Sequence, residues 1–394
     1  RKKKRKKKML KLERDKLLIA AVLIVVVSID MINTSMLAPV LPNIPNLVPF
    51  FAVLLLAMRF AYIHHYSISY LIFAPILLFA GGMVYYKTGN LNALMYMFLL
   101  VFLYKAEMES VLKIYSVVAL FFIVLIVFLA VIGAIPNLQF VQSRSAGVVV
   151  RNSFGFIYPT DFASHCFYLY TAISYIFRKK FIVLRTALGF GLAYFIIRYC
   201  DARLNAASIT VMALIFLYFY FRNDKQRRLF ALLPLSAGIA SSVMIYLSSK
   251  FTWSHPMYVA LNNFFSMRLH LGHEALKKYA VQWFGIRGIS FVGYGGRTES
   301  VLSYDYVDSS YVQMLFTYGM IPVLLLVVLY IVRSWSLYRK KNYLLLTALS
   351  LIAVNCMFEA FWVRPSYNIF MFTLFATLPV IEFESKKSTT RNSL

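Results

Sequence analysis

The chain has 394 residues, of which 61% are hydrophobic and 17% are aromatic. Soluble domains contain about 45–50% apolar residues, so this composition indicates a membrane protein. The formal net charge is +26, but most Lys and Arg residues lie in short breaks between apolar runs. This distribution is typical of the positive-inside pattern of membrane proteins and argues against a nucleic-acid partner.

The first 16 residues form a basic segment that we expect on the cytoplasmic side. Eight consecutive cations, at 1–8, cannot pack against one another, so they are either disordered or lie on anionic headgroups. A third reading takes Met9 as the natural start. No signal-peptide cleavage site follows, and we expect the first apolar run to remain as a membrane anchor.

Twelve apolar runs of roughly spanning length follow, and they predict an all-α polytopic membrane protein with about 12 transmembrane helices. Nine lie in 17–247 and three in 311–382, separated by a large polar loop at 248–310 and followed by a tail at 383–394. The runs are 17–32, 47–63, 67–86, 91–105, 114–135, 157–177, 181–197, 206–221, 229–247, 311–332, 343–360 and 366–382.

The distribution of charge predicts the orientation of these spans. If both termini are cytoplasmic, 29 of the 41 basic residues lie inside and 12 outside, and the loop at 248–310 is external. Eight of the 12 external cations are arginines, which bind phosphate groups through two parallel hydrogen bonds. The set therefore suggests an anionic ligand at headgroup level, although pairing with lipid headgroups or with external carboxylates would also account for single members.

Two short external segments carry candidate site residues. In the first, Arg151 precedes a turn, and Asp161 and His165 stand four residues apart, which places them on one helix face. In the second, Arg198 and Arg203 flank Asp201. We expect one of these two arginines to pair with Asp201 and the other to bind an anion; the sequence leaves open which.

The large external loop at 248–310 contains the remaining candidates. Residues 268–283 have an apolar stripe and predict an amphipathic helix in the outer interface, with Arg268 at its start. His273 is a candidate general base, or a surface residue, and no third ligand accompanies it and His270 to make a metal site. The glycines at 293–296 predict a turn that lets backbone approach a ligand. Asp308 is either a helix cap or a carboxylate that meets substrate.

Three Cys residues are far apart, in or beside apolar runs, with no CxxC or Cys/His metal motif, so we expect small buried side chains; they are Cys166, Cys200 and Cys356. We therefore expect neither a metal nor another cofactor.

At about residues 140–382 the chain resembles the O-antigen ligase and polymerase superfamily, and most of all its Wzy-type polysaccharide repeat-unit polymerases. The motifs are Arg-Asn-x-Phe-Gly-Phe-Ile-x-Pro at Arg151–Pro159, the short external segment with Arg203, and the late external loop. That loop combines Arg268 and Gly-Tyr-Gly with Asp-Ser-Ser-Tyr at Asp308–Tyr311, which runs into a helix containing Tyr-Gly-Met-Ile.

The resemblance implies a C-type glycosyltransferase-like fold in the bacterial plasma membrane. Members act without metal on undecaprenyl-pyrophosphate-linked oligosaccharides at the outer face, and move the growing glycan to the non-reducing end of a lipid-linked repeat unit. In this chain Arg151, Arg203, Arg268, Arg198 and Tyr311 would bind the pyrophosphate or substrate, and Asp308 or His273 would be the base. Chain-length regulator and flippase proteins are the implied partners, beside the lipid bilayer.

Two other functions fit the same sequence. One is an O-antigen-type ligase. The ligases of the family carry His at the position of Asp308 and Ser at the position of Ala202, and these differences from the ligase pattern favour a polymerase. A lipid-linked oligosaccharide flippase or transporter also suits twelve spans. It would require charged residues at the membrane midplane, whereas nearly all ionisable residues here lie at the ends of the spans.

Overall fold

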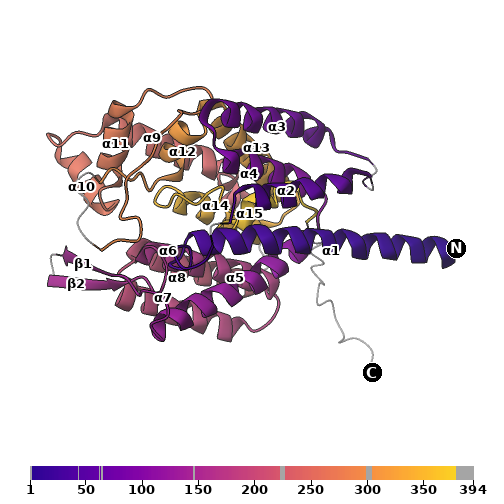
Figure 1. Cartoon of the computed structure of the whole chain (residues 1–394), viewed down its shortest axis with the longest axis horizontal. Helices are drawn as coiled ribbons and strands as arrows, with labels where there is room; N and C mark the ends of the chain where they lie inside the picture. Colours follow the sequence, from indigo (N-terminus) through magenta and orange to yellow (C-terminus); the bar gives the residue numbers. More distant parts are fainter. Residues whose placement is uncertain are drawn as a thin grey trace, which may run out of the picture.

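The computed structural model describes residues 2–42, 44–61, 63, 65–144, 147–221, 227–298 and 304–378. These residues form a helical bundle, shown in Figure 1. The first half of the chain contains α1 (Lys2–Asn33), α2 (Leu47–Leu55), the 3-10 turn η1 (Leu56–Ala61), α3 (Ile68–Thr88), α4 (Leu91–Phe102), α5 (Met108–Val131), α6 (Pro159–Ile176) and α7 (Ile182–Cys200).

The second half of the described chain contains ten further helical elements. They are α8 (Arg203–Phe221), η2 (Arg227–Phe230), η3 (Leu233–Leu235), α9 (Ser236–Lys250), α10 (Pro256–Phe264), α11 (Arg268–Lys278), α12 (Ser310–Thr317), α13 (Met320–Arg339), α14 (Tyr343–Asn355) and the four-residue α15 (Ile369–Phe372), together with the long segments that join them. In Figure 1, α5–α8 form the lower layer and α3, α9, α11 and α13 lie in the upper one, with α1 running lengthwise between them.

A two-stranded antiparallel hairpin projects from the lower layer, and the sequence prediction of a purely helical chain missed it. It consists of β1 (Gln139–Arg144) and β2 (Gly147–Asn152), in a register that pairs Phe140 with Arg151. Alternation along β2 turns Arg151 inward, where it is 5% exposed, and leaves Val150 and Val148 outside. The hairpin is therefore the element that carries Arg151 toward the interior.

Six described helices are long and apolar enough to cross a membrane, which identifies a membrane-embedded, mainly helical protein. They are Ile68–Thr88, Met108–Val131, Ile182–Cys200, Arg203–Phe221, Arg228–Lys250 and Met320–Arg339. They correspond to the predicted runs 67–86, 114–135, 181–197, 206–221, 229–247 and 311–332. The runs 47–63, 91–105 and 343–360 match shorter apolar helices, at Leu47–Ala61, Leu91–Phe102 and Tyr343–Asn355.

The predicted run 311–332 is interrupted. α12 ends at Thr317, and α13 begins at Met320 after Gly319, whose φ of +92° is rarely adopted by residues with a side chain. A Cβ at Gly319 would also collide with the backbone of Phe284 and Gly285. This glycine therefore lets the large loop pack against the break between the two helices.

The predicted helix at 366–382 is wrong over its described part, 366–378. This stretch contains only α15, with turns on either side, although its side chains are buried almost throughout. Neighbouring segments satisfy its backbone: Arg333 donates to the carbonyl of Ala376, and the amide of Lys105 donates to that of Phe375. Irregular backbone is tolerated at such depth because protein, rather than lipid, surrounds it.

The structure describes most of the basic start of the chain but not the tail predicted at 383–394. The basic start belongs to the helix α1 from Lys2, so disorder, one of the two alternatives for 1–8, does not hold for 2–8, and contact with anionic headgroups stays a prediction. The predicted tail at 383–394 lies outside the described residues, as do Arg222 and Lys225.

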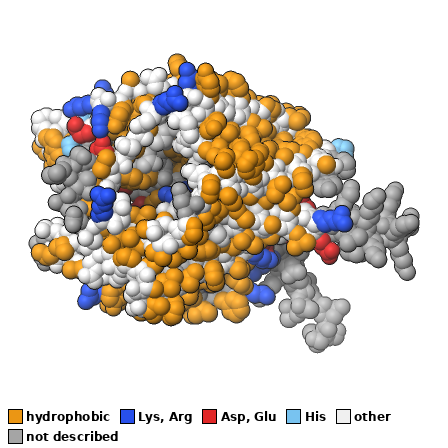
Figure 2. Space-filling view, in the orientation of Figure 1, with side chains coloured by type: hydrophobic (Ala, Val, Ile, Leu, Met, Phe, Trp, Pro, Cys, Tyr) orange, Lys and Arg blue, Asp and Glu red, His pale blue; other side chains and the backbone are white. Residues whose placement is uncertain are grey.

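The outside of the bundle is apolar. Large hydrophobic side chains are exposed along α3, α5, α7, α8 and α9. Figure 2 shows them covering much of the middle of the visible face, with Lys and Arg mainly toward its left side and beside the N-terminal helix. Such a surface fits contact with lipid rather than with water.

Candidate functional site

One cavity brings together predicted site residues that lie far apart in the sequence. It has a volume of about 370 Å³ and lies between hairpin β1–β2, the turn from α7 to α8, the start of α11 and the segment before α12. Its lining includes Arg151, Arg203, Arg268, Asp308 and Glu359. We call it the arginine cavity. The face drawn in Figure 2 is hollowed between its upper and lower halves, and acidic and basic side chains are visible at the floor.

Arg151 is fixed in the wall of the cavity by neutral partners. Its Nε donates to the carbonyl of Cys200 over 2.9 Å, and one terminal nitrogen donates to Gln142 Oε1 and to the hydroxyl of Tyr158. The guanidinium also lies 5.1 Å from the centre of the Tyr158 ring. These contacts orient the guanidinium without neutralising it, so its positive charge remains available to an anion.

The turn between α7 and α8 decides which of its two arginines pairs with Asp201. Arg203 Nε lies 2.9 Å from Asp201 Oδ1, while Arg198 lies over the ring of Tyr199. Asp201 has a φ of +45°, an uncommon conformation for a non-glycine residue. The Arg203 side chain is still 61% exposed, so a molecule in the cavity can reach it.

Arg268 is the first residue of α11 and follows two residues with strained backbone. Ser266 and Met267 both have positive φ, and both line the cavity. Backbone strain of this kind costs about 1–3 kcal/mol per residue and clusters at functional sites. Arg268 Nε donates to the carbonyl of Phe358 over 2.6 Å, which directs its other end at two carboxylates.

Those carboxylates belong to Asp308 and Glu359, each with an oxygen 3.8 Å from the same terminal nitrogen of Arg268. Asp308 does not cap α12, because the residue at the cap position is Ser309 and its side chain makes no capping hydrogen bond. Burial raises the pKa of Asp308 above that of an ordinary Asp, and Arg268 and Arg151 partly offset this effect. A carboxylate with a raised pKa is a better proton acceptor at neutral pH.

Glu359 is the cavity residue that sequence reasoning missed. It is 2% exposed and lies on the segment after α14, inside the predicted span 343–360. Its backbone carbonyl accepts hydrogen bonds from the amide and the hydroxyl of Ser310, which fixes it against the start of α12. The available signal was a single Glu near the end of an apolar run, since an ionisable residue there is costly and marks function by default.

Aromatic rings form another part of the wall. Tyr158 and Tyr294 stack with ring centres 5.4 Å apart and an interplanar angle of 9°, and Tyr304 lies 5.3 Å from Tyr294. Tyr294 belongs to the Gly-Tyr-Gly-Gly turn, in which Gly295 and Gly296 have positive φ. The turn therefore presents a ring as well as backbone to the cavity.

Two further cavities continue from the arginine cavity. The next has a volume of about 240 Å³ and shares Tyr158, Tyr294 and Asp308 with it. A third, of about 410 Å³, shares Asn33, Tyr306 and Arg364 with the second. Arg364 is paired with Asp30 at 3.0 Å, so this cation is already balanced. The series offers room for a ligand much longer than the first cavity alone.

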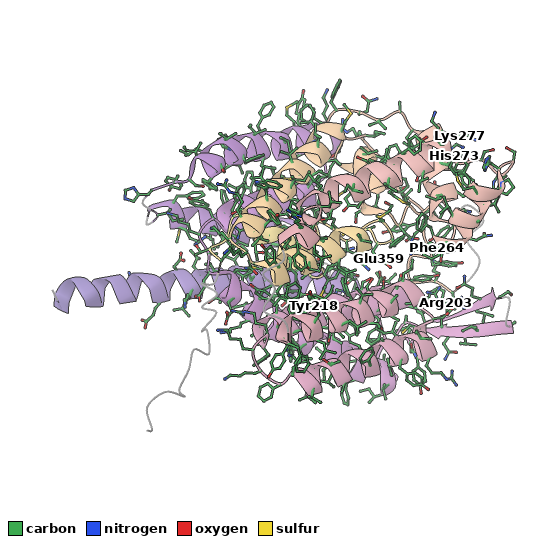
Figure 3. The ribbon with its side chains drawn as sticks, turned by 180° about the vertical axis from the view of Figure 1, so that it is seen from behind. Arg203, Tyr218, Phe264, His273, Lys277 and Glu359 are labelled. Carbon is green, nitrogen blue, oxygen red and sulfur yellow. The ribbon has the colours of Figure 1, made fainter. Side chains whose placement is uncertain are left out.

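Other predicted residues lie away from the arginine cavity. His273 Nδ1 is 2.9 Å from the carbonyl of Ser248, so the ring holds α11 against α9. Figure 3 shows His273 on the upper layer, Glu359 nearer the middle and Arg203 below. The hydroxyl of Tyr311 donates to the carbonyl of Ala353. Neither residue lines the cavity, nor does Arg198, whereas His270 does.

The predicted helical pair Asp161 and His165 is split between two environments. Asp161 lines the second cavity, while His165 is fully buried and stacked on Tyr367 with ring centres 3.7 Å apart. Within the described ranges, no group of three or more His, Cys, Asp or Glu residues could hold a metal ion. The three Cys residues are buried, as predicted.

The arrangement can bind an anion beside a proton acceptor. Three arginines line one cavity: the printed partners of Arg151 are neutral, Arg203 is paired with Asp201, and Arg268 faces two carboxylates. Comparisons with protein-family models, with curated proteins and with solved structures find no match to this chain. The family resemblance therefore stays a prediction, and the geometry carries the functional argument.

Proposed function

We propose that the protein is a glycosyltransferase of the polysaccharide-polymerase type, acting on a glycan linked to undecaprenyl pyrophosphate. The observation that carries this proposal is the convergence of Arg151, Arg203, Arg268 and Asp308, from four separate segments, on one cavity. A pyrophosphate leaving group develops negative charge as it departs, and fixed cations lower the barrier to that step. The arginines supply such charge from the protein itself.

In the proposed reaction, a hydroxyl oxygen of the acceptor sugar attacks the anomeric carbon of the donor glycan. The bond between that carbon and the pyrophosphate oxygen breaks, and the lipid pyrophosphate leaves with the electron pair. Asp308 accepts the hydroxyl proton, and Arg268, which lies between Asp308 and Glu359, stabilises the carboxylate that does so. The tyrosine rings would stack on sugar faces and keep water away.

The proposal also includes the number of membrane crossings, their orientation and the position of the cavity, which go beyond the six spanning helices. It gives the chain about 12 crossings, the last with mostly irregular backbone over its described part, and puts both termini in the cytoplasm of a bacterium, the 248–310 segment outside the plasma membrane, and the arginine cavity at the outer surface. Lys16, on α1, is paired with Glu107 at 2.9 Å, so the start of the first apolar run lies level with the start of α5. The arginine cavity is lined by residues of the hairpin, which follows the end of α5, and by the start of α8, whereas Glu107 precedes the start of α5.

A strain that lacks the gene tests the proposal. Loss of the polysaccharide ladder on a gel, with a single repeat unit retained on the final acceptor, is the expected result for a polymerase. Accumulation of the lipid-linked repeat unit inside the cell would instead indicate a flippase. Intact long chains that fail to reach their acceptor would indicate a ligase.

A further inference from the structure

A groove between α5 and α6 is a cavity that the proposed reaction does not use. Its volume is about 700 Å³. Its walls are apolar, made by Val117, Leu120, Ile173, Ile176 and Phe177. Val117 and Leu120 are 70% and 47% exposed, so the groove opens toward the lipid-facing side of α5. We call this feature the α5–α6 groove.

One end of the groove is strongly basic. Lys113 of α5 lies there with Arg178, Lys179 and Lys180, which directly follow α6. Glu109 is the carboxylate in the described lining of the groove, and it contacts Lys113 at 3.1 Å and Arg178 at 3.3 Å. One carboxylate in the lining cannot neutralise Lys113, Arg178 and Lys180, so this end of the groove carries more positive than negative charge.

The basic end lies at the depth of a membrane surface. Glu107, which directly precedes α5, pairs with Lys16, and the apolar run of α1 begins one residue after Lys16. Headgroups would therefore lie level with the first turn of α5, and acyl chains would lie along the apolar walls further into the helices. Apolar walls below a cluster of cations match the two parts of an anionic phospholipid.

We propose that the α5–α6 groove binds one anionic phospholipid, with its phosphate at Lys113, Arg178 and Lys180 and an acyl chain along Val117 and Ile176. Basic pockets between transmembrane helices hold the head groups of anionic lipids in the same way. The groove is separate from the arginine cavity and shares no lining residue with it. The inference is therefore independent of the proposed glycosyltransferase activity.

The test compares phosphatidylglycerol with phosphatidylcholine of the same acyl chains, added to the delipidated protein in detergent. Native mass spectrometry measures bound lipid, and thermal unfolding measures the stabilisation. We expect one retained phosphatidylglycerol and a higher Tm than with phosphatidylcholine. Equal retention and equal Tm with the two lipids would overturn the proposal.

Two double variants locate the site. Lys113→Gln with Lys180→Gln removes two of the cations, and Lys340→Gln with Lys341→Gln is the matched control at exposed lysines after α13. Each surface cation contributes about 1 kcal/mol to binding an anionic membrane, so the first variant should bind phosphatidylglycerol about 25-fold more weakly. The control should bind as the unmodified protein does; an equal loss in both variants would refute this location.

A third measurement distinguishes binding of the whole lipid from binding of its phosphate headgroup alone. Glycerol 1-phosphate carries the same phosphate without acyl chains, and we expect it to leave Tm unchanged at the concentration at which phosphatidylglycerol raises it. Equal stabilisation by glycerol 1-phosphate would show a phosphate site without the acyl groove, and would contradict the proposal.

Discussion

Replacing Arg268 by Lys tests the arginine cavity most directly, because this change keeps the positive charge and removes the planar fork. Arg268 uses Nε to reach the carbonyl of Phe358 and a terminal nitrogen to face both Asp308 and Glu359. A lysine ammonium is a single point of charge on a flexible stem, so it cannot hold the carbonyl and face the two carboxylates in the same geometry.

The magnitude follows from these contacts. Two unit charges 3.8 Å apart interact by about 4 kcal/mol at an effective dielectric constant of 20, and a lysine retains much of this attraction. What is lost is the bond to the carbonyl of Phe358, about 1.5–3 kcal/mol for a charged donor. Misplacing a donor that stabilises developing charge costs about 10²–10³ in rate. We therefore expect Arg268→Lys to reduce polymerisation by about that factor.

The assay measures polymer length and initial rate, with the purified protein and a lipid-linked repeat unit. Membrane abundance and Tm of the variant show whether it still folds. Arg198→Lys is the matched control, because Arg198 was predicted from sequence to bind substrate but lies over Tyr199, outside the cavity. Normal chain lengths in Arg268→Lys, or an equal loss in Arg198→Lys, would refute the role of the cavity arginine.

Three further predictions concern the proton acceptor and the metal. Asp308→Asn should lower the rate by about 10²–10⁴, the range for loss of a general base. The pKa of Asp308 is raised and the base must be deprotonated, so wild-type activity should fall on acidification at a higher pH than it would with an ordinary Asp. A flat pH profile through that range would contradict this assignment. His273→Gln should leave the rate within a few-fold, since its ring contacts Ser248 rather than the cavity, whereas a loss as large as that of Asp308→Asn would make His273 the base. EDTA should leave the purified protein active, and a loss that a divalent ion restores would show that a metal takes part.

Part of the fold and of the candidate site could be predicted from the sequence. Six of the twelve hydrophobic runs correspond to helices long enough to span a membrane, because spanning requires about 20 consecutive apolar residues, a local property of the chain. Arg151, Arg203, Arg268 and Asp308 could be chosen as candidates from the sequence, because arginines bind phosphate groups and a carboxylate can accept a proton. That these four side chains line one cavity required the folded structure.

Tertiary contacts decided the rest. The sequence left both helix capping and substrate contact open for Asp308, and only the structure excludes capping, because Ser309 holds the cap position and Asp308 lies 3.8 Å from Arg268. Glu359 was missed although it is an ionisable residue near the end of an apolar run, because the run does not show where its helix ends. The end depends on the hydrogen bonds that Ser310 makes to the carbonyl of Glu359.

The sequence by itself determined that the chain is embedded in a membrane, where its apolar runs lie, and which charged residues lie between those runs. These are properties of composition and of local spacing. Only the tertiary structure decided that Arg203 pairs with Asp201, that His273 faces Ser248, and that 366–378 packs as turns. The physical reason is that each depends on a partner brought close by folding, from two to more than two hundred residues away in the chain.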